Sequence, residues 1–197
     1  LRLADRMVVL QDMGLEELTP ELRAKTRVIY QSAKPGRRQP PLRNCFEVTV
    51  IGHLREEKDP FRCAWALKYL PAHSRIRVAQ LGRAMSAEME RQARDWMAKE
   101  PRYRWLEERP HWQAMRHLAR SRLMVISSRM EGGANVVGEA LARGVPVIAS
   151  RISGNLGMLG ETYPGYYPLG NERALAKLLR RAESQPAFYR SLITACA

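Results

Sequence analysis

Residues 123–150 read LMVISSRMEGGANVVGEALARGVPVIAS. The stretch opens with an apolar run of strand length at 123–126 and continues into a turn that holds two adjacent glycines. Glycine has no Cβ, so a backbone built from it can bend sharply and approach a ligand closely. A helical pattern then runs from 135 to 143 and ends at Gly144, a common residue after a helix. The stretch therefore predicts a strand, a tight turn and a helix.

Two carboxylates mark this unit. Glu131 lies at the mouth of the turn and Glu139 on the second turn of the predicted helix, with seven residues between them. Between the carboxylates, the backbone amides of Gly133, Ala134 and Asn135 point out of a helix N-terminus, where anions bind readily. A nucleotide-sugar requires carboxylates that accept hydrogen bonds from its hydroxyls, beside amides that donate to its phosphates. Taken alone, a strand, a glycine-rich turn and a helix also occur in many other α/β proteins.

The composition indicates a globular protein. The chain has 197 residues, of which 45% are hydrophobic and 27% charged, and no apolar run approaches the length that spans a membrane. Cys45, Cys63 and Cys196 are odd in number and widely spaced, which favours a reducing cytoplasm over a disulfide framework or a metal site. The chain starts at Leu1 without an initiator methionine or a signal-peptide core, which we interpret as the start of a fragment.

The formal net charge is +13, and its distribution matters more than its size. The excess positive charge is spread over the whole length, without a block of five or more like charges. A nucleic-acid-binding protein usually concentrates lysine and arginine on one face or arm. The spread charge therefore favours a mild preference for anionic ligands over dedicated binding of nucleic acid.

Strand-like and helical patterns alternate along most of the chain. Predicted strands fall at residues 46–51, 75–81, 103–106, 123–127 and 145–150, and helices begin near residues 59, 86, 111, 135, 171 and 186. Strands separated by helices of this length form βαβ units. The predicted fold class is therefore α/β, with a Rossmann-like parallel sheet flanked by helices.

A break in this pattern predicts a domain boundary. The stretch 34–43, KPGRRQPPLR, holds three prolines and a glycine and is typical of a linker or an exposed loop. We therefore expect residues 1–33 to be the remnant of a preceding domain, 34–44 an interdomain linker and hinge, and 45–197 the main domain. Within the first part, the pattern predicts strands at 5–10 and 26–30 and a short helix at 19–24.

Polar residues follow three of the predicted strands, at the ends where open parallel sheets bind ligands. The candidates are His53, Arg55 and Lys58 after the first strand, Arg83 after the second, and Pro110 and His111 after the third. Read alone, a mixed-charge loop of this kind is equally typical of a solvated surface.

The string from Glu131 to Ala149 resembles the donor-site signature of retaining glycosyltransferases with the GT-B fold, especially family 4. The resemblance implies that the main domain is the C-terminal, UDP-sugar-binding domain of such an enzyme. It implies that Glu131 contacts the sugar hydroxyls, Glu139 the ribose hydroxyls and Lys58 the donor diphosphate. The family arginine that accompanies this lysine is replaced by His53, so that either His53 or Arg55 takes its role.

The same resemblance extends the set of donor contacts and excludes a cofactor. It places Arg83 near the diphosphate and the segment ending in Pro110 and His111 near the base. The remaining donor contacts would come from the turn, namely Gly132, Gly133, Ala134 and Asn135. Lys58 and the turn amides would stabilise the charge that develops on the leaving diphosphate, so no metal ion and no other cofactor is expected.

Three segments resemble a narrower group. Residues 55–62 (REEKDPFR), 128–144 and 151–168 are similar to the selenosugar synthases of selenoneine biosynthesis, which join selenophosphate to the sugar of a UDP-sugar. This resemblance implies UDP-GlcNAc or UDP-glucose as donor and selenophosphate as acceptor. The acceptor site would lie mainly on the missing N-terminal domain, so the chain alone is expected to bind a donor without turning it over.

Other functions stay open from the sequence. The protein could be a family 4 glycosyltransferase with another acceptor. It could be a nucleotide-sugar epimerase of the GT-B fold, although such an enzyme needs further acid–base residues in the cleft, and we identify none. A basic nucleic-acid-binding module is motivated only by the net charge.

Overall fold

A computed structural model describes residues 3–196 and contains a six-stranded sheet with strand order β5-β4-β3-β6-β7-β8. Every neighbouring pair in this sheet is parallel. The strands are β3 (Phe46–Ile51), β4 (Ile76–Leu81), β5 (Tyr103–Trp105), β6 (Leu123–Ile126), β7 (Val147–Ser150) and β8 (Tyr166–Tyr167). The predicted parallel α/β fold is therefore confirmed.

The strand order reverses between β3 and β6. From β3 the chain adds β4 and then β5 on one side, and it then returns to add β6, β7 and β8 on the other side. The loops that leave β3 and β6 consequently diverge and open a crevice at the carboxyl ends of these strands. Ligands of open α/β sheets bind in such a crevice.

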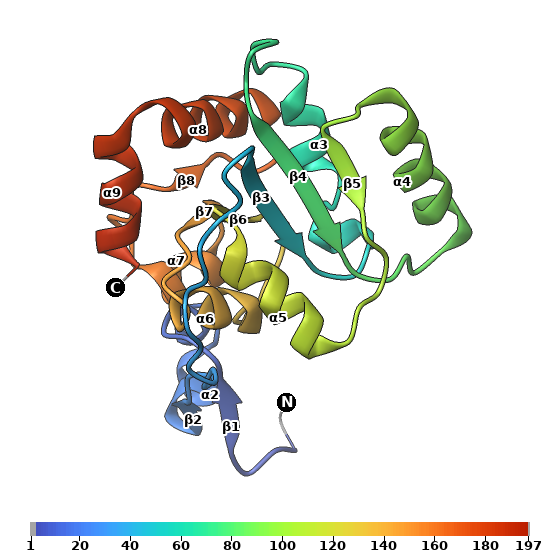
Figure 1. Ribbon diagram of the computed structural model, residues 1–197. Coiled ribbons are helices and arrows are strands. Elements are labelled where there is room, and N and C mark those ends of the chain that lie inside the picture. The colour runs from blue at the N-terminus through green and yellow to red at the C-terminus, as the bar shows by residue number, and fades with distance from the viewer. Residues whose placement is uncertain (1–2, 197) are drawn as a thin grey trace.

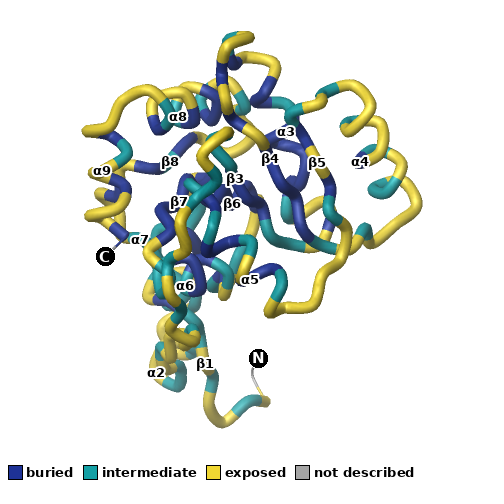
Figure 2. The backbone as a smooth tube through the Cα atoms, viewed as in Figure 1, coloured by how far each residue is buried: buried dark blue, intermediate teal, exposed yellow. Residues whose placement is uncertain are grey.

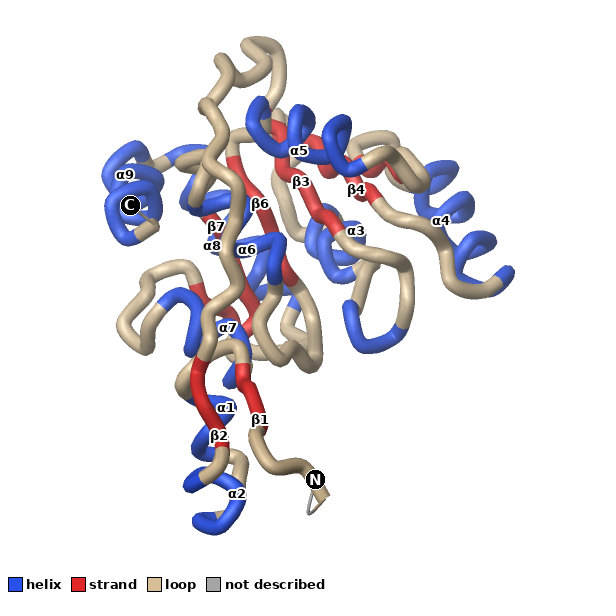
Figure 3. The backbone as a smooth tube through the Cα atoms, turned by 90° about the horizontal axis from the view of Figure 1, so that it is seen from below, coloured by secondary structure: helices blue, strands red, loops and turns tan. Residues whose placement is uncertain are grey.

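Helices cover both faces of the sheet. Figure 3 shows α5 and α3 on opposite sides of it, and α3 packs against α8. The helices are η1 (a 3₁₀ turn, Glu56–Lys58), α3 (Arg62–Leu67), α4 (Ala87–Lys99), α5 (His111–Arg120), α6 (Asn135–Leu141), α7 (Ser153–Leu159), α8 (Glu172–Ser184) and α9 (Pro186–Ala195). The sequence pattern predicted neither α7 nor β8.

The first part of the chain forms a small unit below the sheet (Figure 1). Its elements are β1 (Met7–Val9), α1 (Met13–Glu16), α2 (Pro20–Ala24) and β2 (Thr26–Val28). β1 and β2 pair with each other in parallel and not with the main sheet. This unit packs against the main domain through α1 and α7. The predicted strands and the helix at 19–24 are present, each within a few residues of its expected bounds.

The segment expected to be a linker contains no helix or strand, but it does not run freely through solvent. Gly36 N donates to Ala142 O at 3.3 Å, and Gln39 N donates to Ala119 O at 3.0 Å. Arg38 is half-buried in this segment, and its burial lowers the pKa of its guanidinium. The segment is therefore a strap over the C-terminal ends of α5 and α6.

The hydrophobic core lies in the main domain. Figure 2 shows the central strands as buried, and every residue of β6 and β7 is buried. In contrast, Gln11 alone is buried among the described residues before position 34. Since the first unit has no core of its own, its structure depends on packing against the main domain.

Candidate functional site

A cleft of about 610 Å³ lies at the carboxyl ends of the strands, where the strand order reverses. The loops after β3, β4, β5 and β6 contribute to its walls. Its polar lining consists of Gln31, His53, Arg55, Lys58, Glu108, Arg109, His111, Glu131, Asn135 and Glu139, with backbone from Gly52, Gly82, Gly133 and Ala134. This volume suits a small organic ligand.

Glu131 is held by two donors on a single oxygen. Lys58 Nζ lies 2.5 Å from Glu131 Oε1, and Ser128 Oγ donates to the same atom at 2.5 Å. The Glu131 side chain is 9% exposed. Among residues 3–196, no hydrogen-bond partner is found for its second oxygen, Oε2. One oxygen is thus used for orientation, and the other is left for a ligand.

Glu139, on α6, is also hydrogen-bonded through one of its oxygens. His111 Nε2 lies 2.6 Å from Glu139 Oε1, and the carboxylate requires this nitrogen to be the donor. The Glu139 side chain is 11% exposed, whereas the His111 side chain is 70% exposed. The start of α5 therefore reaches across the cleft to α6.

The turn before α6 depends on only one of its two glycines. Gly133 has a φ of 158°, and a Cβ at this residue would lie 2.7 Å from Leu10 Cβ of the first unit. A Cβ at Gly132 would meet no atom within 4 Å. Gly133 therefore allows the first unit to pack against the turn, and Gly132 faces open space outside the cleft.

The loop after β3 is fixed to the end of β6 by a buried serine. Ser127 Oγ donates to Asp59 O at 2.9 Å and also lies 3.1 Å from Lys58 O. Arg129 N donates to Glu57 O at 2.7 Å. These bonds join η1 to the residues that follow β6, and so they bring Lys58 within reach of Glu131.

The ends of β3 and β4 also lie very close together. Gly82 has a φ of 144°, and a Cβ there would lie 2.0 Å from Gly52 O. His53 Nδ1 accepts the backbone N–H of Arg83 at 3.2 Å. Because Nδ1 is an acceptor, the proton of the neutral ring is on Nε2, which can donate to an anion without the ring being charged.

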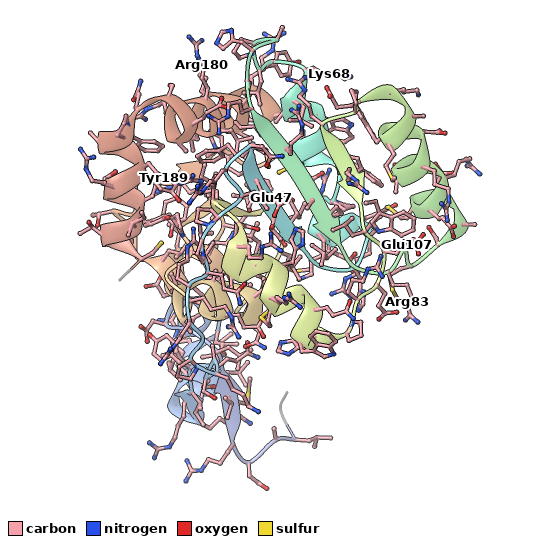
Figure 4. All side chains as sticks on the ribbon, viewed as in Figure 1. Glu47, Lys68, Arg83, Glu107, Arg180 and Tyr189 are labelled. Carbon is pink, nitrogen blue, oxygen red and sulfur yellow. The ribbon has the colours of Figure 1, made fainter. Side chains whose placement is uncertain are left out.

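The structure brings together most of the residues predicted from the sequence. His53, Arg55, Lys58, His111, Glu131, Gly133, Ala134, Asn135 and Glu139 all line the cleft. Three do not: Gly132, Pro110 and Arg83. The Arg83 side chain lies at the surface, with Nη2 4.0 Å from Met85 Sδ, and Figure 4 shows it at the edge of the molecule.

Several lining residues had not been singled out from the sequence. Glu108 and Arg109 belong to the loop after β5, and Gln31 comes from the segment after β2. Their position in the loop after β5 could have indicated Glu108 and Arg109 as residues that line the cleft. Nothing in the local pattern around Gln31 indicates a binding residue, because the first unit reaches the cleft only through its packing on the main domain.

Within residues 3–196, no group of three or more histidine, cysteine, aspartate or glutamate side chains is placed to hold a metal ion. In the same part of the chain, no helix is long and apolar enough to cross a membrane.

A family model described as glycosyl transferases group 1 matches residues 37–196. The match begins within the strap and extends through α9, so it includes the whole six-stranded sheet and every lining residue of the cleft except Gln31. No curated protein matches the sequence.

Solved structures of glycosyltransferases have the same fold. HepE of Anabaena, solved with UDP and glucose, has a TM-score of 0.79 and 17% identity over 99% of this chain. A glycosyltransferase from Rickettsia africae has a TM-score of 0.82 and 15% identity over 98% of this chain. The lipopolysaccharide glycosyltransferase WaaG has a TM-score of 0.76 and 16% identity over 97%. In each case the chain spans 57% of the length of the solved protein.

Proposed function

This chain belongs to the glycosyl transferases group 1 family, and on that premise we propose that it forms the donor-binding domain of a UDP-sugar-dependent glycosyltransferase. The observation that carries the proposal is that two largely buried carboxylates, Glu131 in the turn after β6 and Glu139 on α6, line one cleft at the reversal of strand order. HepE, which has the same fold, was solved in complexes with UDP and with UDP-glucose.

We assign the two carboxylates to different parts of the donor. Glu139 accepts from the ribose diol, since it lies on α6 beside the loop after β5, which would receive the base. Glu131 accepts from a hydroxyl of the transferred sugar through its free Oε2. A carboxylate that accepts from hydroxyls makes charge-assisted bonds, which fix orientation as well as affinity.

The diphosphate would lie between the two carboxylates. Lys58 and the amides of Gly133, Ala134 and Asn135 would neutralise it as the bond to the sugar breaks, because charge then develops on the leaving phosphate. His53 would donate a hydrogen bond to the diphosphate from its neutral ring through Nε2. Arg55, on the same loop, would add a positive charge. Because these groups would neutralise the diphosphate, the proposal includes a reaction that needs no metal ion.

The acceptor is proposed from sequence resemblance alone. Residues 55–62, 128–144 and 151–168 are similar to selenosugar synthases, so we propose selenophosphate as acceptor and a selenosugar as product. In this proposal residues 1–33 belong to the acceptor domain, residues 34–44 join the domains, and the protein acts in the cytoplasm. Gln31 in the cleft wall supports a contact between the first unit and the donor.

Calorimetric titration with UDP-glucose and UDP-GlcNAc tests donor binding. Lys58→Ala should weaken binding of either ligand by about tenfold or more, as expected for a lost charge-assisted bond. Lys68→Ala is the matched control, since Lys68 does not line the cleft and its ammonium lies over the Trp96 ring. A folded chain that binds neither ligand would contradict the proposal.

A further inference from the structure

A line of buried polar groups extends from α7 through β7 and β6 to Glu131. Asn155 Nδ2 donates to Ser150 O at 2.9 Å and to Ser150 Oγ at 3.1 Å. Ser150 Oγ donates to Ser128 O at 2.7 Å, and Ser128 Oγ donates to Glu131 Oε1 at 2.5 Å. We call Asn155, Ser150 and Ser128 the relay.

All three relay residues are removed from solvent. Asn155 and Ser150 are 0% exposed, and Ser128 is 2% exposed. Burying polar groups is unfavourable unless each hydrogen bond is made, and a hydrophobic residue would fill the same space at no such penalty. Three adjacent buried polar residues that lead to one cleft carboxylate therefore call for a role beyond packing.

The direction of the hydrogen bonds is the same along the relay. Each side chain donates toward the next residue, and the last donor reaches the carboxylate. Asn155 Oδ1 is buried and has no hydrogen-bond partner within residues 3–196, so in this part of the chain the amide is engaged only through its Nδ2 donor. Ser150 is bonded to the carbonyl of Ser128 and not to its hydroxyl, so the relay holds the Ser128 main chain, from which the Ser128 hydroxyl reaches Glu131.

The main chain of Glu131 is held from the same side. A Cβ at Gly154 would lie 2.0 Å from Glu131 O, so the first turn of α7 packs directly beneath the Glu131 backbone. The relay fixes the Glu131 side chain, and this contact fixes its backbone. The relay begins at Asn155 and the backbone contact is made by Gly154. Both residues lie on α7, an element that does not line the cleft.

We propose that the relay is a positioning device that keeps Glu131 Oε1 bound so that Oε2 faces the sugar of the donor. This inference rests on the proposed function. It extends that function to three residues that do not line the cleft. Since Glu131 would contact the sugar and not the nucleotide, the relay should affect recognition of the sugar alone.

The test compares the dissociation constants of UDP and UDP-glucose by calorimetry. Ser150→Ala and Asn155→Ala should each weaken binding of UDP-glucose by about fivefold or more, the scale of a lost buried hydrogen bond, and leave UDP binding within twofold of wild type. Ser128→Ala removes the donor that contacts Glu131 itself, so it should weaken binding of UDP-glucose by at least as much, and it serves as the test should the other two variants fail to fold. Ser121→Ala is the control, because Ser121 is equally buried and hydrogen-bonds Thr49 and His117 instead.

The possible outcomes separate the two proposals. If all folded relay variants bind UDP as wild type does and keep the wild-type ratio of the dissociation constants for UDP and UDP-glucose, the positioning role is overturned. The proposed function would not be affected by that result. Loss of both affinities in proportion, matched by Ser121→Ala, would also overturn the positioning role, since the effect would then be general destabilisation. A folded wild-type chain that binds neither ligand would overturn the proposed function, and this inference with it.

Discussion

Glu100 and Arg102 form a partly buried ion pair before β5. Arg102 donates to Glu100 through Nη2 at 2.7 Å and through Nε at 2.8 Å, and its backbone N–H donates at 3.0 Å. Arg102 Nη2 also donates to Leu67 O at 2.8 Å, so the pair joins the end of α3 to the start of β5. The bond from the Arg102 side chain lowers the pKa of Glu100, although burial opposes it.

The lowered pKa of Glu100 gives a pH dependence of known sign. A carboxyl with a lower pKa in the folded state stabilises the fold above its ordinary pKa, and this stabilisation is lost as the pH falls through the lowered value. Glu100→Gln should therefore reduce the free energy of unfolding by about 1–2 kcal/mol at pH 7. Urea titration should show a much smaller difference at about pH 2. An equal difference at both pH values would refute this role.

A second ion pair, between Arg62 and Asp59, is buried deeply enough to contribute to the free energy of unfolding. Arg62 is 6% exposed and donates to Asp59 Oδ2 at 2.8 Å, to Glu172 Oε2 at 2.6 Å and to Gly170 O at 2.7 Å. It connects the start of α3 to the start of α8. Arg62→Ala leaves Asp59, itself 4% exposed, without its cationic partner and should lower the free energy of unfolding by roughly 3 kcal/mol.

The matched control is an exposed pair of the same chemistry. Arg94 is paired with Glu90 on α4, and both side chains are about half exposed. Arg94→Ala should lower the free energy of unfolding far less than Arg62→Ala does, because an exposed ion pair is well solvated when it is broken. Guanidinium titrations of both variants would refute this ranking if Arg94→Ala were the more destabilised.

At the scale of elements, the loops of the cleft depend on backbone contact between strand ends. Gly82→Ala would place a Cβ 2.0 Å from Gly52 O at a positive φ of 144°, and should lower the free energy of unfolding by about 3 kcal/mol or more. Gly144 has a φ of 65° and open space around it, so that Gly144→Ala should lower it by only about 1 kcal/mol. Thermal unfolding that ranks the two variants in the opposite order would contradict the close contact of β3 and β4.

The elements that the sequence predicted, and those that it did not, differ in a physical way. The strands of the main sheet are either apolar throughout, as in β6 (LMVI), or alternate apolar with polar residues, as in β3 (FEVTVI), and β6 and β7 are buried at every position, so their pattern was clear. The helix α7 has the sequence SGNLGML, in which two glycines lower the intrinsic propensity for helix. Its conformation is held by tertiary contacts, such as the buried Asn155 amide, which no local pattern reveals.

The candidate site follows the same rule. Residues directly after strand ends could be placed in the cleft from topology alone, as Lys58 and Glu131 were. The direction of the Arg83 side chain could not, because it depends on the close contact of Gly82 with Gly52. The Ser128 bond to Glu131 was missed, since a serine beside a glutamate has no distinctive signal until the backbone brings them together.

At the scale of the whole molecule, the fold places one cleft where three conditions meet. The strand order reverses there, two largely buried carboxylates line it, and among residues 3–196 its basic lining consists of Arg55, Lys58 and Arg109, together with two histidines. The family match covers this region except for Gln31. The central claim is therefore that this cleft binds the UDP moiety, with the ribose diol at Glu139.

The most direct test of this claim is a calorimetric comparison of UDP with 2′,3′-dideoxyuridine diphosphate on wild type and Glu139→Ala. Wild type should bind UDP about tenfold or more tightly than the dideoxy compound, because Glu139 loses its hydroxyl partners in the latter. Glu139→Ala should bind both compounds with the same weakened affinity. If Glu139→Ala, folded as shown by circular dichroism, binds UDP as tightly as wild type does, then the ribose does not lie at Glu139 and the account is wrong.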